Sequence, residues 1–300
     1  MFQDEKIRKL FEQILHDWEV WHNEPQIKLL EQFAEEGRRI NYIYAVAVCA
    51  SASSYTIFGL APYIYYSFVP NSNKSRESYQ VPEKYVPSNG GYIYISIAYN
   101  LLSLWTNSII FITADSIYFS LVQHSCGLFA AVGNRFEAIG KKYSGSTKMS
   151  DILYCILKYN SALKFAAELN EIYSIYFFFT VGINAANIIF AASQTIIHFE
   201  SSTETVKFGN YGILMVGLFF LNSFPAQKLI DRSFKITQNI YNSNWYEMPT
   251  SIRKSLFIVL LRASNLCTIN VGKICILSLQ TFSTVVRTTV SMCMMILSLR

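Results

Sequence analysis

The last stretch of the chain carries polar side chains, which could do chemistry, within an otherwise apolar run. Residues 263–299 are mostly apolar, but Gly, Ser, Thr, Gln, Lys and Arg interrupt them. A helix that met only lipid would not carry these groups, because polar and charged side chains are costly in hydrocarbon. On a helical period of 3.6 residues, one stripe is formed by Lys273, Leu277, Gln280, Thr284 and Ser291. The stripe predicts a side that faces water, as in a pore, or another helix through hydrogen bonds, and the pattern leaves both open.

Asp115 is the other residue of chemical interest, because it lies within an apolar run of residues 92–129. An acidic side chain inside a membrane span is a functional candidate by default. At about 1.5 Å per residue counted from Tyr92, however, Asp115 falls close to the inner headgroups, where we expect it to be paired or wetted. No partner for it is evident on another span, and the four histidines and six cysteines show no ligand or disulfide spacing. Without a matched catalytic set, the sequence predicts neither an enzyme nor a metal site nor a cofactor.

The polar residues named above lie in or beside long blocks of the sequence without charged residues, and the helices that these blocks form must position them. Hydrophobic residues make up 52% of the chain and charged residues only 15%, which is the balance of a membrane protein rather than of a soluble domain. A span needs about 20 mostly apolar residues, whereas buried helices of soluble proteins are usually shorter and amphipathic. The blocks predict an all-α fold, a polytopic membrane helix bundle with five spans: residues 40–68, 92–129, 172–197, 208–227 and one within 263–299. Pro62 is expected to end or kink the first span, and Pro225 to close the fourth.

Lysine and arginine are distributed unevenly among the segments between the spans. Three segments carry six each, eighteen in all, whereas the loops on the opposite side carry four. The positive-inside rule then places the amino end in the cytoplasm and the carboxyl end outside, which speaks against a G-protein-coupled receptor. The sequon at Asn73 falls in an outer loop, where it can be glycosylated. The expected division is a cytoplasmic segment (1–39), four spans with loops (40–228), a second cytoplasmic part (229–262) and a last helix (263–300).

Several short motifs stand out along the chain, the most specific of them near its C-terminal end. The C-terminal ones are residues 241–249 (Tyr-Asn-Ser-Asn-Trp-Tyr-Glu-Met-Pro), the pair Arg253 and Lys254, and Gly272 followed by residues 277–282 (Leu-Ser-Leu-Gln-Thr-Phe). Supporting pieces upstream are residues 36–40 (Glu-Gly-Arg-Arg-Ile), 58–62 (Phe-Gly-Leu-Ala-Pro), 155–156 (Cys-Ile) and 168–169 (Glu-Leu). These motifs resemble those of insect odorant receptors, and the resemblance covers most of the chain. The related insect gustatory receptors end in a Thr-Tyr…Gln-Phe pattern, which residues 289–292 do not match.

The resemblance implies a seven-span receptor with its amino end inside, of which this chain carries the last five spans. Residues 1–39 then correspond to the first intracellular loop, and we expect a truncated gene model, a partial sequence or a pseudogene-like product. The implied function is that of an odorant-binding subunit of a ligand-gated, non-selective cation channel in the plasma membrane, serving the sense of smell. The implied partners are a co-receptor, in a hetero-tetramer, a small volatile apolar ligand and the lipid bilayer, but no nucleic acid. The alternative is a non-signalling subunit that only assembles.

Candidate residues can be named for each part of this function. An odorant site should be an apolar, aromatic-lined cavity in the outer half of the bundle. Its candidates, each of which also fits simple packing, are Ser51, Ser54, Phe58, Leu101, Trp105, Tyr211 and Met215. The pore candidates are Lys273, Leu277, Gln280 and Thr284, with Leu277 and Gln280 at the narrowest part. The cytoplasmic anchor between subunits should involve Trp245, Tyr246, Pro249, Leu256 and Leu260.

Overall fold

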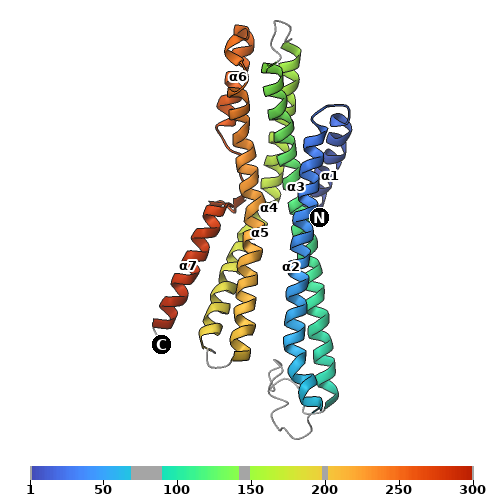
Figure 1. Ribbon diagram of the computed structural model, residues 1–300, viewed down its shortest axis with the longest axis vertical. Helices are drawn as coiled ribbons and strands as arrows, with labels where there is room; N and C mark the ends of the chain where they lie inside the picture. Colours follow the sequence, from blue (N-terminus) through green and yellow to red (C-terminus); the bar gives the residue numbers. More distant parts are fainter. Residues whose placement is uncertain (1, 69–89, 142–148, 198–201, 299–300) are drawn as a thin grey trace.

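The computed structural model describes residues 2–68, 90–141, 149–197 and 202–298 of the 300-residue chain. This part is almost entirely helical, so the prediction of an all-α bundle is confirmed (Figure 1). The helices are α1 (Phe2–Trp21), α2 (Ile27–Phe68), α3 (Gly90–Lys141), α4 (Met149–Ile197), α5 (Ser202–Tyr241), α6 (Thr250–Ala263) and α7 (Leu279–Ser298). A short 3₁₀ helix, η2 (Trp245–Glu247), precedes α6, and the strands β1 (Asn270–Val271) and β2 (Cys275–Ile276) pair as an antiparallel hairpin before α7.

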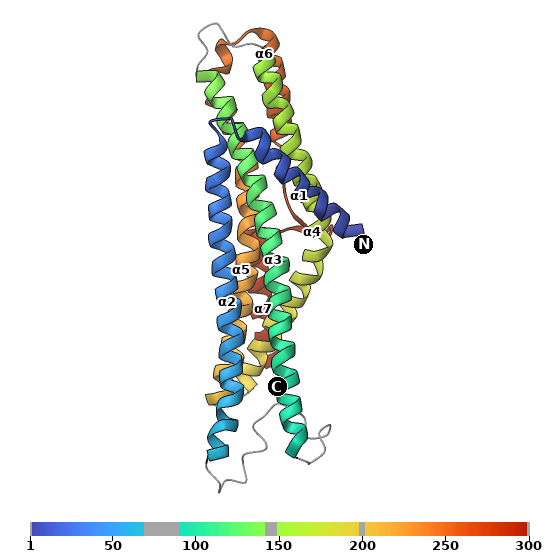
Figure 2. The ribbon, with the colours of Figure 1, turned by 90° about the vertical axis from the view of Figure 1, so that its right-hand side faces the viewer.

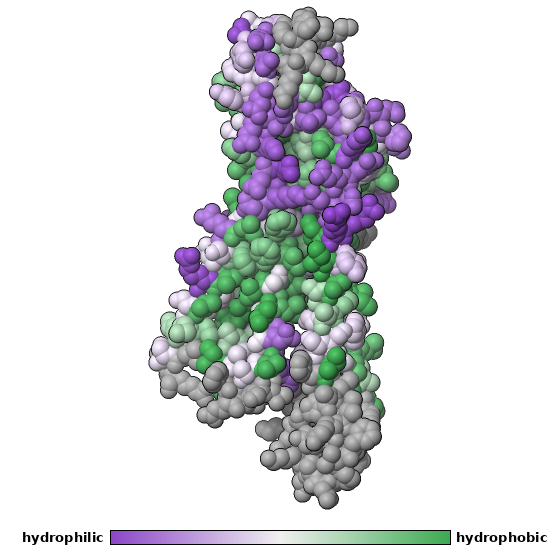
Figure 3. Space-filling model, in the orientation of Figure 1, coloured by the Kyte–Doolittle hydropathy of each residue, from purple (hydrophilic) through white to green (hydrophobic). Residues whose placement is uncertain are grey.

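The four long helices extend well beyond a bilayer. They contain 42, 52, 49 and 40 residues in α2, α3, α4 and α5, which corresponds to about 60–78 Å, at least twice the thickness of a hydrocarbon core. In both ribbon views α2 runs beside α3, and α4 runs with α5 (Figures 1 and 2). Figure 3 shows polar side chains over the end of the molecule that carries α1 and α6, and an apolar belt below them. The helices therefore continue from the belt into the polar end.

Three of the described helices are long and apolar enough to cross a membrane, within Ile97–Ile139, Met149–Ile197 and Thr205–Tyr241. These correspond to the second, third and fourth predicted spans. The first and fifth predicted spans correspond to α2 and α7, which the same criterion of length and composition does not select among the described residues. The structure therefore shows a polytopic membrane bundle, and the count of five spans stays a prediction.

Several helix ends differ from those predicted. Helix α2 continues past Pro62 to Phe68, and α5 continues past Pro225 to Tyr241, so neither proline ends its helix. The ring of Pro225 removes only one intrahelical hydrogen bond, the one to the carbonyl four residues earlier. The next turn is held in place by packing, because Ala226 is fully buried in the bundle. Burial thus outweighs the local preference of proline, and the single helix joins the apolar belt to the polar end.

The greatest difference from prediction is the hairpin that precedes α7. The expected last helix over residues 263–299 is broken, and α7 begins only at Leu279. Gly272 has a φ of +60° and opens a turn in which the Ile274 N–H donates to the Val271 carbonyl over 3.2 Å. Such a left-handed residue suits a tight hairpin and is accessible to glycine at little cost. Lys273 and Leu277 therefore lie in the hairpin, and the predicted helical stripe is wrong at these two positions.

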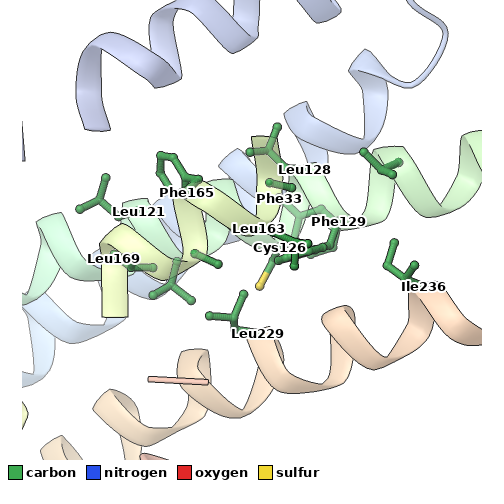
Figure 4. Packing of buried hydrophobic residues seen from close by; sticks show 14 of the residues in the cluster. Phe33, Leu121, Cys126, Leu128, Phe129, Leu163, Phe165, Leu169, Leu229 and Ile236 are labelled. Atoms are coloured by element: carbon green, nitrogen blue, oxygen red, sulfur yellow. The ribbon is translucent and has the colours of Figure 1, made fainter. Parts of the chain in front are cut away.

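Helix α3 forms the centre of the core. Most of its residues from Tyr118 to Val132 are buried, because helices on several sides pack against this part of α3. Side chains of α3 pack there against side chains from three other helices (Figure 4). The residues are Leu121, Cys126, Leu128 and Phe129 of α3, Phe33 of α2, Leu163, Phe165 and Leu169 of α4, and Leu229 and Ile236 of α5. This cluster fixes α2, α4 and α5 around α3 and so sets the positions of the polar side chains on these helices.

Candidate functional site

Asp115 is buried at the centre of the bundle, with only 2% of its surface exposed. The Tyr176 hydroxyl of α4 donates to its Oδ1 over 2.7 Å, and the Tyr44 hydroxyl of α2 donates to its Oδ2. The Asn222 amide of α5 approaches Oδ2 at 3.4 Å. Asp115 was expected to be paired or wetted, and the structure shows it paired: three other long helices each supply a partner that the sequence did not make evident. Asp115 thus connects four helices, and the cluster of Asp115, Tyr44, Tyr176 and Asn222 is named the Asp115 brace.

Aromatic rings enclose the Asp115 brace. The Tyr118 ring lies 4.7 Å from the ring of Phe177 and 5.1 Å from that of Tyr173, measured between centroids. The Tyr118 hydroxyl donates to the Asn222 carbonyl over 3.2 Å. A buried network in which the carboxylate oxygens are satisfied makes the packing of its helices more specific. No nucleophile or acid–base pair accompanies the carboxylate among these contacts, so the arrangement is suited to holding helices and not to catalysis.

A small hollow, named here the outer hollow, lies between α2 and α5 in the halves of these helices that are away from the polar end. It is lined by Ser51, Tyr55, Lys207, Asn210 and Tyr211. The Asn210 amide donates to the Ser54 hydroxyl over 3.1 Å, and that hydroxyl donates to the Ser51 carbonyl over 2.9 Å. The structure thus brings together three of the predicted ligand-binding residues and adds Asn210. The hollow has a volume of about 20 Å³, which is room for about one water molecule.

The other predicted ligand-binding residues do not line this hollow. On α3, Trp105 is 37% exposed and Leu101 is half-buried. Met215 is half-buried on α5, one turn from Tyr211. The side chain of Phe58 and the whole of Asn73 lie outside the described residues. The ligand-binding and glycosylation roles of all these residues stay predictions.

The hairpin is docked on α4 through its backbone. The Gly272 N–H donates to the Ser174 carbonyl over 2.9 Å, and the Ser174 hydroxyl donates to the Gly272 carbonyl over 2.8 Å. A Cβ added at Gly272 would lie 3.1 Å from the Phe178 ring. Leu277 is completely buried in the core, whereas Lys273 at the turn is exposed. The side chain of Leu277 therefore faces the interior of its own chain, which gives no support to a place at a pore constriction.

Helix α7 has two distinct faces. One packs on the bundle: the Phe282 ring lies 5.3 Å from that of Phe219, and Thr289 and Cys293 are almost fully buried. The opposite face is exposed and carries a polar row, defined here as the α7 polar face, formed by Gln280, Thr284, Arg287 and Ser291. The predicted pore candidates Gln280 and Thr284 lie on this face. The predicted stripe is therefore present along α7 itself.

The predicted anchor region also has an inner and an outer side. Leu256 is buried against the core, Leu260 and Trp245 are half-buried, and Tyr246 and Pro249 are exposed. The outer side of α6 is apolar and exposed, with Phe257, Ile258 and Leu261 each more than half exposed. These three residues were not predicted because they do not lie on the buried face of α6, although their spacing along the helix indicates a second apolar face. Behind the anchor, burial raises the pKa of the Cys267 thiol to about 11, and Arg262 opposes that shift in part.

The comparisons with known proteins agree with these features. The family model described as "7tm Odorant receptor" matches residues 1–290. Odorant receptor 9a of Drosophila melanogaster is 23% identical over 225 residues, which is 71% of this chain and 56% of the relative. Odorant receptor Or2 of Anopheles gambiae is 22% identical over 180 residues, or 56% of this chain and 45% of the relative. The chain thus spans about half the length of these curated relatives.

Solved structures of the olfactory receptor OR5 from Machilis hrabei share the fold. The eugenol complex of that receptor matches with a TM-score of 0.76 and 11% identity, and covers 91% of this chain and 69% of the other. A second structure of the same receptor matches with a TM-score of 0.65 and 11% identity over 99% of this chain and 75% of the other. At such identity the likeness shows the fold alone, and the family follows from the match over residues 1–290. The chain belongs to the 7tm odorant receptor family and is a multi-pass membrane protein.

Proposed function

We propose that the chain is the odorant-binding subunit of a ligand-gated, non-selective cation channel, which it forms with a co-receptor subunit in the plasma membrane of cells that sense smell. The observation that carries the proposal is the two-sided character of α7. One face is buried on α4 and α5, and the other is a polar row on a helix whose remaining residues are mostly apolar. Exposed polar groups on a membrane helix are costly unless they face water or polar partners. Water in a shared pore satisfies this requirement.

Charge and hydropathy together support the orientation that we propose. The segments rich in lysine and arginine include residues 1–39 and 229–262, which contain α1 and α6. Figure 3 shows polar side chains over this end of the molecule. Under the positive-inside rule this end is cytoplasmic and the end of α7 is extracellular. The α7 polar face then descends from the cytoplasmic side towards the outside.

The ligand site is proposed at the outer hollow between α2 and α5. The related OR5 receptor of Machilis hrabei has been solved with eugenol, a small molecule that carries an aromatic ring and a hydroxyl group. Asn210 and Ser54 offer polar groups of the kind that orient such a molecule, and Tyr211 offers an aromatic wall. At about 20 Å³ the hollow must widen to hold a ligand. Binding would therefore favour the widened arrangement by population shift.

The small hollow also supports a second candidate, a subunit that assembles with the co-receptor but binds no odorant. The exposed apolar row of Phe257, Ile258 and Leu261 on α6 supplies a surface for assembly in either case. The two candidates differ only in whether the outer hollow takes a ligand. Co-expression of the chain with an insect odorant co-receptor separates them.

The test measures whole-cell currents and co-purification in the same cells. Odorant-evoked currents that depend on this chain support the proposal, and co-purification without a response to any odorant in a broad panel supports the assembly subunit. Failure to co-purify would overturn both. For the pore, Gln280→Ala should change the ratio of calcium to sodium permeability. Met292→Ala should not, because Met292 is exposed on another side of α7.

A further inference from the structure

A second, larger cavity lies at the polar end of the bundle, between α1, α2 and α3. Its volume is about 240 Å³, and its lining includes Phe11, Trp18, Leu30, Arg38, Gln123 and His124. It shares no residue with the outer hollow between α2 and α5. A pocket for a drug-sized molecule usually measures about 300–1,000 Å³. This cavity is therefore suited to a compact polar group with an apolar neighbour.

Gln123 is the most unusual side chain of this cavity. It is 1% exposed, and both its Oε1 and its Nε2 lack a hydrogen-bond partner among the described residues. An unpaired buried amide is destabilising, so native structures seldom leave one unsatisfied. Two of its polar neighbours in the lining are already engaged: His124 with Asp17 at 3.2 Å, and the Ser120 hydroxyl with Asn41 at 3.1 Å. Gln123 thus has one acceptor and one donor group free for a ligand.

Arg38 adds a cation to the same cavity. The neighbouring Arg39 pairs with Glu35 at 2.9 Å, and Glu36 pairs with Lys228, but no carboxylate pairs with Arg38 in the described part of the chain. A free guanidinium binds phosphate or carboxylate well, because its N–H groups form charge-assisted hydrogen bonds. Phe11, Ile14 and Trp18 supply the apolar wall opposite these groups. The lining therefore combines a cation, an amide with both hydrogen-bonding roles, and apolar side chains.

We propose that this cavity binds the headgroup of an anionic phospholipid that carries hydroxyl groups. The phosphate would accept hydrogen bonds from Arg38, and a hydroxyl group would both donate to and accept from the Gln123 amide. Helix α1 lies where the polar end of the molecule meets the apolar belt (Figures 1 and 3). A headgroup in the cavity can therefore leave its acyl chains in the bilayer. Basic pockets at the cytoplasmic boundary of a bundle suit such headgroups.

Native mass spectrometry of the 300-residue chain in detergent tests the proposal. Short-chain phosphatidylinositol and short-chain phosphatidylcholine are added in competition, and the bound lipid is counted. The expected result is one retained phosphatidylinositol, with at least tenfold weaker binding in Arg38→Gln and in Gln123→Leu. Arg39→Gln is the matched control, since it removes the adjacent guanidinium, which is already paired, and should bind as the unchanged chain does. Equal loss in Arg38→Gln and Arg39→Gln would indicate general surface charge and overturn the proposal.

Two further arms keep the test decisive. Ala34→Leu fills the cavity without removing a polar group, and it should displace the lipid. Trp18 fluorescence, with Trp18→Phe subtracted, should respond to phosphatidylinositol at lower concentration than to free inositol phosphate. A response to free inositol phosphate at equal or lower concentration would assign the site to a soluble phosphate and overturn the lipid. If Gln123→Leu stabilises the chain and leaves phosphatidylinositol binding unchanged, the cavity holds only water and the proposal fails.

Discussion

Removal of the Asp115 carboxylate should destabilise the bundle more than removal of any one of its partners. Asp115→Leu leaves the hydroxyls of Tyr44 and Tyr176 and the Asn222 amide without their acceptor. Hydrogen bonds between membrane helices average about 0.6 kcal/mol and reach about 1.7 kcal/mol. Two of these bonds are short and the third is long at 3.4 Å. The substitution should therefore cost roughly 2–5 kcal/mol.

The assay is thermal denaturation in a lipid nanodisc, followed by the loss of the monodisperse peak in size-exclusion chromatography. At about 2–4 °C per kcal/mol, Asp115→Leu should lower the midpoint by roughly 4–20 °C, and Tyr176→Phe by roughly 1–7 °C. Asp115→Asn should fall between them, because an amide oxygen still accepts one or two of the bonds. The residual activity of each variant is not needed for this measurement.

A double-mutant cycle gives the decisive result. In the Asp115→Leu background, the further change Tyr176→Phe should cost little or nothing, because the bond is already lost. Full additivity of the two changes would refute the brace. So would an unchanged midpoint for Asp115→Leu.

Other features give shorter predictions. Gly272→Ala should lower the midpoint by roughly 2–8 °C, since a left-handed backbone costs other residues about 1–2 kcal/mol; Gly182→Ala, in open space on α4, should not lower it. Asn210→Ala should shift the half-maximal odorant concentration by roughly 3–10-fold in current recordings, and unchanged curves for every active odorant would exclude the outer hollow. With its pKa raised to about 11, Cys267 is protonated at neutral pH, so maleimide should label it slowly in the folded chain, faster as the pH rises, and readily in detergent-unfolded protein; rapid labelling at neutral pH would contradict its burial.

The fold class could be predicted because membrane spans require long runs of residues without charge. Charges are absent from long blocks, and those blocks became the apolar parts of α2, α3, α4 and α5. The hairpin was missed because residues 264–278 are apolar enough to continue a helix by composition. Gly272 is compatible with a turn, but only its hydrogen bonds with Ser174 of α4 show why the turn forms there. Local composition therefore predicts that a segment is apolar more reliably than it predicts its backbone conformation.

The Asp115 brace could not be predicted, because its partners are remote in the sequence. Tyr44, Tyr176 and Asn222 lie 71, 61 and 107 residues from Asp115. Whether these side chains meet depends on the relative positions of the four helices along their axes, which the residue pattern of a single helix does not indicate. Ser51, Ser54 and Tyr211 lie near one another because they share the same halves of two adjacent helices. The same reasoning could not reveal that the hollow between them is nearly closed.

The Asp115 brace lies almost at the midpoint of α3, 25 residues from Gly90 and 26 from Lys141. Each half of the helix is therefore an arm of about 38 Å. With the fulcrum held by three other helices, a rotation of about 3° displaces both tips by about 2 Å, in opposite directions. Mechanical leverage of this kind would make the two ends of α3 move together without any change in its own hydrogen bonds. A displacement at one end of the bundle would then be transmitted to the other.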